Sequence, residues 1–388
     1  MECKLFKQCG SCHYINQDYS LQLEHKKEYC KQLIQKAHLP INVASITGQQ
    51  IPYNYRNKVI IGFNAKGEPG FYEENSHKIV PYKGCLLDDQ LCDEIILFIT
   101  SLFKKYRIVI YNQDKRTGFL RHLLLRCGKE SKEYMVTLVA TSLIFPGSKN
   151  FISELIQKYP MIKTVVINEN KRQTSIVLGD KSKVLYGKGY IQDTLCGLKF
   201  SISSNSFYQI NHEQCEALYT KGLSLLNLKK EDYLIDTYCG IGTIGMIAAK
   251  QCKEVLGIEL NKQATKDAIN NARINHIENI QFLNGDSTKC MEELAKQNIT
   301  VDALVMDPPR DGSTERFIKA VNDLKVKKVL YISCNPETQV RDLKVFKTLN
   351  YHLSNMHLVD MFPHTKSIES IVILTKDFNE NKQRKYKK

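Results

Sequence analysis

The second half of the chain alternates short apolar runs with helical stretches, and this alternation constrains the fold more than any other feature. Runs that are joined by helical crossovers of roughly ten to fifteen residues are typical of a parallel sheet. We therefore predict an α/β fold, a doubly wound Rossmann-like sheet, after about residue 201. Two last runs, His352–Asp360 and Ile368–Lys376, have no helix between them and should close the sheet as a hairpin. The alternating runs are Tyr233–Asp236, Glu254–Glu259, Ile280–Asn284, Val301–Asp307 and Lys328–Ser333.

The first half has a different rhythm. A helix is predicted over Ser20–His38, with Leu23, Cys30, Leu33 and Ile34 on one face. Short β-rich runs between turn residues then predict an α+β unit on a largely antiparallel sheet, with a helix near Phe151–Lys158. We expect four parts: residues 1–45, 46–200, 201–378 and a basic tail at 379–388. The β-rich runs are Val59–Phe63, Arg107–Tyr111, Tyr134–Ala140, Thr164–Asn168 and Thr174–Leu178.

Composition excludes several classes of protein. Hydrophobic residues at 43% and charged residues at 25% exclude wholesale disorder or a fibrous repeat. No apolar run approaches the ~18 residues of a membrane span. The first residues contain no hydrophobic stretch of the kind that a secretory signal has. We expect a soluble, cytoplasmic monomer, in which the 13 cysteines stay reduced. The net charge of +14 is compatible with a polyanionic partner and equally with a lysine-rich proteome.

A glycine-rich turn follows the first parallel strand. Asp236-Thr-Tyr-Cys-Gly-Ile-Gly-Thr-Ile-Gly245 contains GxGxxG, a pattern that places a tight turn at a helix N-terminus. Glu259 ends the next strand, where a carboxylate can bind ribose hydroxyls. Both a nicotinamide dinucleotide and S-adenosylmethionine fit this pattern. Asp236 favours the second, because a carboxylate there opposes a pyrophosphate and suits a sulfonium and an amino group.

Two more motifs end strands at the same predicted edge. Asp307-Pro-Pro-Arg310 follows the fourth strand, and Ser333-Cys334-Asn335-Pro336 follows the fifth. A cysteine beside a cofactor cleft suggests a nucleophile, which an inert methyl acceptor such as carbon 5 of uracil requires. Glu369, at the start of the last strand, is the candidate base that removes the carbon-5 proton. Taken alone, Cys334 could equally be a buried structural cysteine and Glu369 a surface carboxylate.

Taken together, these motifs resemble the RNA uracil-5-methyltransferases. SFYQIN (206–211), DTYCGIGTIG, Glu259, DPPR, SCNP and MFPHTKSIE carry the resemblance over nearly the whole chain. The resemblance implies a methyltransferase that forms 5-methyluridine from S-adenosylmethionine through a covalent adduct of Cys334, with Glu369 as base. One departure is Ser367, where the family usually has a histidine two residues before the glutamate. The implied cofactor contacts are Gln209, Tyr238, Thr243, Glu259, Asp286 and Asp307.

Three cysteines crowd the first dozen residues. Cys3, Cys9 and Cys12 supply three closely spaced thiolates, and both a zinc site and an iron–sulfur site need a fourth ligand. Spacing alone does not choose the metal. The resemblance implies a [4Fe–4S] cluster, as in the ribosomal-RNA branch of the family, with Cys85 as fourth ligand; Cys30 and Cys92 are weaker alternatives.

RNA is the implied partner, and 23S ribosomal RNA the implied substrate. The T-loop uridine of tRNA is the alternative. We expect no small β-barrel RNA-binding domain ahead of the cysteine motif, so the β-rich unit has to hold the RNA. Candidate contacts, each equally explained by surface solubility, are Tyr55–Lys58, Lys104–Arg107, Arg121, His122, Arg126 and the tail 382–388.

Two other classes of protein use only part of this pattern. A nicotinamide-dependent oxidoreductase would explain GxGxxG and leave DPPR, SCNP and Glu369 unused. An RNA-binding or iron–sulfur scaffold would need none of Cys334, Glu369 and Asp307. We therefore favour the methyltransferase over both.

Overall fold

The computed structural model describes residues 2–74, 76–81, 83–297 and 299–378. The chain forms two compact units, and each is drawn from separate stretches of sequence. Unit 1 comprises residues 1–18, 50–212 and 363–366; unit 2 comprises 19–49, 213–362 and 367–388. The basic tail that we predicted at 379–388 lies outside the described residues. Among the described helices, none has the length and hydropathy to cross a bilayer.

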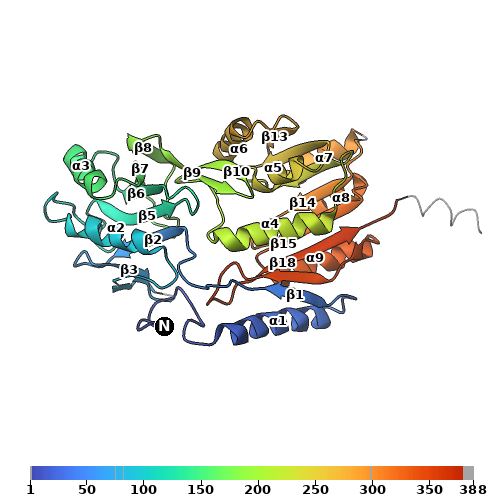
Figure 1. Ribbon diagram of the computed structural model, residues 1–388, viewed down its shortest axis with the longest axis horizontal. Helices are drawn as coiled ribbons and strands as arrows, with labels where there is room; N and C mark the ends of the chain where they lie inside the picture. Colours follow the sequence, from blue (N-terminus) through green and yellow to red (C-terminus); the bar gives the residue numbers. More distant parts are fainter. Residues whose placement is uncertain (1, 75, 82, 298, 379–388) are drawn as a thin grey trace, which may run out of the picture. The chain divides into compact units, whose positions relative to one another are not determined.

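Unit 1 is built on a seven-stranded sheet of order β4-β3-β2-β5-β6-β7-β8 (Figure 1). Every neighbouring pair is antiparallel except β6 and β7, which α3 connects, so the predicted α+β architecture is confirmed. Helices α2 and α3 bury their apolar faces against β5–β7 to form one core. The elements are β2 (Lys58–Phe63), β3 (Pro69–Tyr72), β4 (Ile79–Pro81), α2 (Gln90–Ser101), β5 (Leu120–Cys127), β6 (Tyr134–Ala140), α3 (Ser148–Lys158), β7 (Ile162–Glu169), β8 (Lys181–Gly187) and the hairpin β9 (Tyr190–Leu195) and β10 (Leu198–Ser203).

Two predicted strands of this unit are wrong. Residues 107–111 make only an isolated bridge, Ile110 to Leu120, and Arg107 has a left-handed φ of 54°. Residues 174–178 form no strand either, because the Asn170 side chain donates to the carbonyls of Ile176 and Val177, 2.8 Å each. The Asn170 side chain thus supplies hydrogen bonds that a neighbouring strand would otherwise give to these carbonyls.

Unit 2 holds the predicted parallel sheet, of order β1-β17-β18-β15-β14-β11-β12-β13, with β18 alone antiparallel to its neighbours. Helices α1, α7, α8 and α9 contribute to the core on one face, and α4 and α5 pack on the other, so the sheet is doubly wound. The predicted closing hairpin is present as β17 and β18. The elements are α1 (Tyr19–Lys36), β1 (Val43–Thr47), α4 (His212–Leu226), β11 (Tyr233–Thr237), α5 (Thr243–Ala249), β12 (Glu254–Glu259), α6 (Lys262–Ile274), β13 (Ile280–Asn284), α7 (Ser287–Lys296), β14 (Ala303–Met306), α8 (Glu315–Asp323), β15 (Lys328–Ser333), α9 (Pro336–Thr348), β16 (His352–Leu353), β17 (Met356–Val359) and β18 (Glu369–Thr375).

The two units differ from the predicted boundaries in two places. Helix α1 and strand β1 belong to unit 2, because β1 extends the sheet by pairing in parallel with β17 and α1 packs on α9. Residues 201–212 belong to unit 1, where β10 pairs with β9 and the Asn57 side chain donates to the Gln209 carbonyl at 2.8 Å. Long-range strand pairing of this kind leaves no local trace in sequence.

Candidate active site

The glycine-rich turn lies between β11 and α5, at the carboxyl edge of the parallel sheet. Gly240 and Gly242 have left-handed φ angles of 58° and 82°. A Cβ atom at Gly242 would lie 2.9 Å from the Phe282 ring, so the turn requires glycine there. The Gly245 N–H donates to Oδ2 of Asp236 at 2.8 Å. This carboxylate therefore stabilises the turn itself, a structural role that we had not predicted for it.

Carboxyl groups surround this turn. Glu259 ends β12 and accepts from the Gly240 N–H at 3.0 Å, while Asp286 caps α7 by accepting from the Lys289 N–H at 3.0 Å. Burial, and then the charges of Asp307 and Glu259, raise the pKa of Asp236 to about 8. Burial raises the pKa of Asp307 to about 7. Carboxyl groups with pKa values raised in this way disfavour further negative charge such as a pyrophosphate, and a cationic sulfonium and an amino group suit them.

The predicted cofactor contacts fall into two sets. All of the others belong to unit 2, at or just after the carboxyl ends of β11, β12, β13 and β14: Tyr238, Thr243, Glu259, Asp286 and Asp307. Gln209 is buried in unit 1. The donor set of unit 2 thus fits S-adenosylmethionine without Gln209: glycine N–H groups, carboxylates for a ribose and an amino group, and the half-buried ring of Tyr238.

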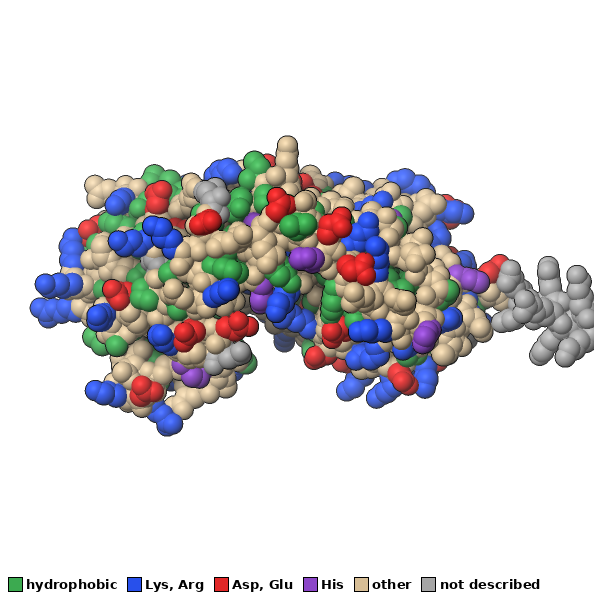
Figure 2. Space-filling model, turned by 90° about the horizontal axis from the view of Figure 1, so that it is seen from below, with side chains coloured by type: hydrophobic (Ala, Val, Ile, Leu, Met, Phe, Trp, Pro, Cys, Tyr) green, Lys and Arg blue, Asp and Glu red, His purple; other side chains and the backbone are tan. Residues whose placement is uncertain are grey.

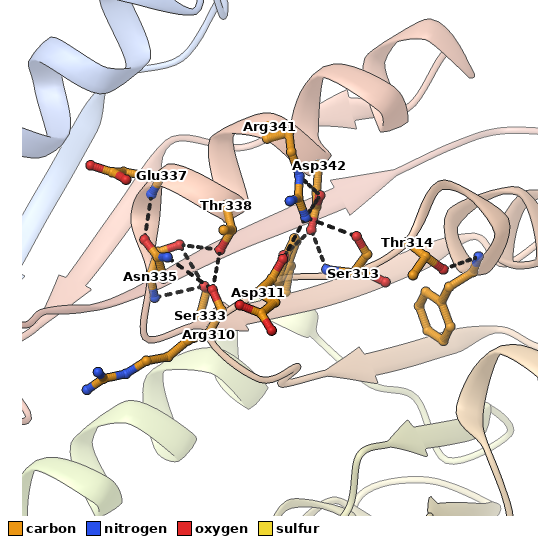
Figure 3. A network of polar contacts seen from close by, with 12 residues as sticks. Arg310, Asp311, Ser313, Thr314, Ser333, Asn335, Glu337, Thr338, Arg341 and Asp342 are labelled. Atoms are coloured by element: carbon orange, nitrogen blue, oxygen red, sulfur yellow. Dashed lines mark hydrogen bonds and ion pairs between the residues drawn. The ribbon is translucent and has the colours of Figure 1, made fainter. Parts of the chain in front are cut away.

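The DPPR loop is tied to the SCNP loop by a polar network (Figure 3). The Arg310 carbonyl accepts from the Asn335 side chain at 3.0 Å and from the Thr338 hydroxyl at 3.1 Å. Asn335 in turn caps α9 by accepting from the Glu337 N–H. In Figure 3 the Arg310 side chain extends away from this network. The backbone of Arg310 therefore joins the two loops and its guanidinium stays available.

Asp342 is a residue of this network that sequence reasoning missed. Its Oδ2 accepts from the Ser313 N–H and the Tyr331 hydroxyl, at 2.7 Å each, and the side chain is buried. These bonds fix the loop that follows DPPR (Figure 3). The available signal was an aspartate at a core-facing position of the last predicted helix, since a buried carboxylate needs such partners.

Cys334 lies half-buried at the end of β15, within the field of three other charged groups. Burial, and then the charges of Glu369 and Asp307, raise the pKa of the Cys334 thiol to about 11, and Arg310 opposes the shift. The thiol is therefore neutral at pH 7 in the free protein. A cation placed beside the carboxylates would favour the thiolate.

Glu369 is the first residue of β18 and is almost fully buried. Burial, and then the charge of Asp307, hold its pKa well above the usual range of a glutamate. Its Oε2 atom has no hydrogen-bond partner within the described chain. A buried carboxyl group without a local partner is costly for stability and typical of a functional group. The charges of Glu369 and Asp307 thus act on Cys334, and the charge of Asp307 acts on Glu369, so the three side chains lie near one another at the edge of the sheet.

Near Glu369, Ser367 stands where the family histidine would be. His364, the histidine of the same motif, belongs to unit 1, where its ring stacks on Tyr53 with centroids 4.9 Å apart. The structure thus gives His364 a packing role inside unit 1.

The four predicted metal-ligating cysteines all belong to unit 1. Cys3, Cys12 and Cys85 pack on one small apolar cluster, and burial together with Cys3 and Cys9 raises the pKa of Cys12 to about 11. Arg56 lowers the pKa of both Cys12 and Cys85, which places its charge near both thiols. The charges of Cys3 and Cys9 act on Cys12, and Cys85 packs on the same apolar cluster, so the four cysteines lie in one region of unit 1. The donor set therefore fits a site for a soft metal or an iron–sulfur cluster.

The two alternative ligands belong elsewhere. Cys30 is buried in the core of unit 2. The thiols of Cys92 and Cys127 and the carboxylate of Asp89 form a second group, in which the ligand atoms lie within 4.8 Å of one another. Asp89 is already bonded to Lys129 at 3.0 Å and to the Tyr134 hydroxyl at 2.8 Å. This second group is therefore a satisfied structural cluster.

Comparison with known proteins gives consistent matches. The profile of the tRNA (uracil-5-)-methyltransferase family matches residues 164–377. An uncharacterized RNA methyltransferase of Halalkalibacterium halodurans is 38% identical over 377 residues, which cover 96% of this chain and 82% of that protein. Another, of Oceanobacillus iheyensis, is 38% identical over 373 residues, 95% and 81% of the two chains. The crystal structure of Pyrococcus abyssi tRNA (uracil-54, C5)-methyltransferase in complex with S-adenosyl-L-homocysteine is similar with a TM-score of 0.79 and 26% identity, covering 95% of this chain and 86% of that one.

Proposed function

We propose that this protein methylates carbon 5 of a uridine in 23S ribosomal RNA. The premise is that the chain belongs to the tRNA (uracil-5-)-methyltransferase family and is an S-adenosylmethionine-dependent RNA methyltransferase. The observation that carries the proposal is the cluster of Cys334, Glu369 and Asp307 beside the glycine-rich turn.

The residues divide the chemistry between them. The Cys334 thiolate adds to carbon 6 of the uracil, which turns carbon 5 into an enolate-like nucleophile. S-adenosylmethionine, when bound, supplies the electrophilic methyl group. Glu369 then takes the carbon-5 proton, and the electron pair of that bond expels the Cys334 thiolate from carbon 6. Arg310, which opposes the raised pKa of both groups, favours the ionised thiol and the ionised base.

The raised pKa values suit this sequence of steps. In the free protein the cluster is largely neutral, because three acids share one buried place. A bound sulfonium would add the missing positive charge and favour the thiolate of Cys334. We infer that cofactor binding precedes and activates the nucleophile.

The alternative substrate is the T-loop uridine of tRNA. It is supported by the similarity to an archaeal protein whose structure is named tRNA (uracil-54, C5)-methyltransferase. The ribosomal substrate is supported by the resemblance of the cysteine motif to the ribosomal-RNA branch. Both substrates use the same chemistry at Cys334 and Glu369.

Incubation with tritiated S-adenosylmethionine and total RNA from a strain that lacks this gene distinguishes the substrates. We expect label in 23S RNA, recovered as 5-methyluridine after digestion, and none with a Cys334→Ala variant. Mapping the labelled nucleotide would identify the uridine. Label confined to tRNA would select the alternative, and label in no RNA would contradict both.

Most basic candidates for RNA contacts are committed to the fold. Arg121 donates to the carbonyls of Asn170 and Arg172, and Lys105 pairs with Glu154 at 2.6 Å. On the face that Figure 2 displays, Lys and Arg side chains alternate with acidic ones and do not form a single patch. The +14 charge therefore does not mark the RNA surface by itself.

Lys58 is a candidate that no such bond commits to the fold. It lies directly opposite Arg126 across β2 and β5, and burial together with the charge of Arg126 lowers its pKa to about 8. Among the described residues no carboxylate pairs with either cation. Like charges that face each other across a sheet are destabilising unless an anion compensates them. We propose that an RNA phosphate binds at Lys58.

We also propose a [4Fe–4S] cluster on Cys3, Cys9, Cys12 and Cys85. Within the described chain no three of these thiols lie within 4.8 Å of one another. Tetrahedral zinc holds its sulfurs about 3.8 Å apart, whereas a cubane carries each thiolate on a different iron and spaces them more widely. All thirteen cysteines are free thiols, so the four proposed ligands are available to a metal.

Anaerobically purified protein should be brown and contain about four irons per chain. Cys85→Ala should lower the iron content sharply, because a cubane that loses one thiolate is bound weakly. Cys92→Ala and Cys290→Ala are the controls and should keep it. Colourless protein with one zinc per chain, or iron lost from Cys92→Ala in place of Cys85→Ala, would contradict the assignment.

A further inference from the structure

We propose that helix α1 acts as a clamp that positions the catalytic base, with Lys26 as its principal positioning residue. The clamped part, here called the base segment, comprises residues 360–369. The proposal rests on the role of Glu369 proposed above. It adds a function for helix α1, which belongs to unit 2, whereas the proposed metal ligands belong to unit 1.

One oxygen of the base carboxyl group lacks a partner that could position it. Oε2 of Glu369 has no hydrogen-bond partner among the described residues, and the side chain is 2% exposed. Its backbone opens β18 in register with Val359, the last residue of β17. The place of the carboxylate therefore depends on the residues that connect these two positions.

Lys26 holds the first part of this connection, inside unit 2. Its Nζ lies 2.6 Å from Oδ1 of Asp360 and donates to the Phe362 carbonyl at 3.2 Å. The Tyr19 hydroxyl donates to the other carboxylate oxygen of Asp360 at 2.9 Å. Both members of the ion pair are buried, with side chains 2% and 0% exposed. α1 thus binds the residue that directly follows the partner of Glu369 in the sheet.

A buried ion pair is a poor device for stability alone. Removing two charges from water costs about as much as their attraction returns, so an apolar pair of similar volume is often as stable. An ion pair does differ from an apolar pair in fixing direction and distance. The buried position of this ion pair therefore indicates that Lys26 fixes the position of the base segment relative to α1.

The next two carbonyls of the base segment are held as well, inside unit 1. The Tyr55 hydroxyl donates to the Pro363 carbonyl at 3.0 Å. The backbone N–H groups of His13 and Tyr14 donate to the His364 carbonyl at 2.8 and 3.0 Å. Three consecutive carbonyls, from Phe362 to His364, thus accept hydrogen bonds from groups within the first 55 residues of the chain.

This arrangement predicts a defect in one step. A loosened base segment leaves Cys334, the DPPR loop and the glycine-rich turn in place, so the adduct forms and the methyl group is transferred. Removal of the carbon-5 proton slows, because a misplaced base loses its alignment. The methylated RNA should therefore remain attached to Cys334.

The test compares Lys26→Met and Tyr55→Phe with wild type in single-turnover reactions on the RNA that the enzyme labels. We measure the ratio of protein-linked methylated RNA, stable to denaturation, to released methylated RNA. Both variants should raise this ratio about 10- to 100-fold. Lys31→Met, on an exposed face of the same helix, is the matched control and should leave it unchanged.

The same ratio distinguishes a misplaced base from global destabilisation of the enzyme. Loss of folded enzyme lowers the amounts of adduct and product together and leaves their ratio unchanged. If Lys26→Met fails to fold, Lys26→Met/Asp360→Leu removes the unpaired buried carboxylate and should restore folding with the raised ratio. A folded variant with the wild-type ratio would overturn the clamp. Absence of adduct from Glu369→Gln as well would overturn the proposed role of the base, and with it the clamp.

Discussion

Replacing Cys334 by alanine should lower methyl transfer to below about one thousandth of the wild-type rate, because no other described group stands where a nucleophile is needed. The same change should abolish covalent trapping on RNA that contains 5-fluorouridine. In that RNA, carbon 5 carries a fluorine, which a base cannot remove in the way that it removes a proton. The wild-type enzyme therefore stays attached through carbon 6. Trapping is measured as an RNA-shifted protein band under denaturing conditions.

Cys290→Ala is the matched control for this experiment. Cys290 is also half-buried in unit 2, on α7, where burial and then the charge of Asp286 raise the pKa of its thiol, and none of Cys334, Glu369 and Asp307 contributes to that shift. It should keep both turnover and trapping. Unchanged activity of Cys334→Ala would eliminate the thiolate mechanism, whereas loss of activity in both variants would indicate a general effect on folding.

The thiol also predicts a pH dependence. A pKa near 11 in the free protein means that the thiolate fraction rises as pH increases, so adduct formation should accelerate with pH. The carboxyl of Glu369, with its raised pKa, also needs to be ionised to act as a base. Both effects have the same sign, and activity should therefore fall as the solution becomes acidic.

Replacing Glu369 by glutamine should reduce product release about 10²- to 10⁴-fold, the usual contribution of a general base. The amide has nearly the same shape and cannot accept the carbon-5 proton. Since Cys334 and the methyl donor are unaffected, methylated RNA should accumulate as a covalent adduct. The measurement is the denaturation-stable fraction of labelled RNA at the end of one turnover.

Glu293→Gln provides the control, because this exposed glutamate on α7 only pairs with Lys296. It should show wild-type release. Glu369→Gln that releases product at the wild-type rate would assign the proton to another base. In that case the orphaned buried carboxylate of Glu369 would require a structural explanation.

Much of the candidate site follows from order along the chain. The strand-end motifs at Glu259, Asp307 and Cys334 converge because parallel strands present their carboxyl ends at one edge. Glu369 joins them from the antiparallel β18, where the closing hairpin had been predicted. The errors, at residues 107–111 and 174–178, occurred where an isolated bridge or an asparagine side chain replaced a strand partner.

The sequence alone determined the fold class and the family, and it supplied the residues that we propose as reacting groups, because these depend on local periodicity and on residue types at strand ends. Only the tertiary structure decided which unit contains α1 and β1, which arginines are committed to carbonyl groups, and that Lys26 is bonded to Asp360. Those relationships join residues up to 334 positions apart. Side-chain pairing over such distances is decided by how helices and strands pack, and no local pattern in the chain carries that information.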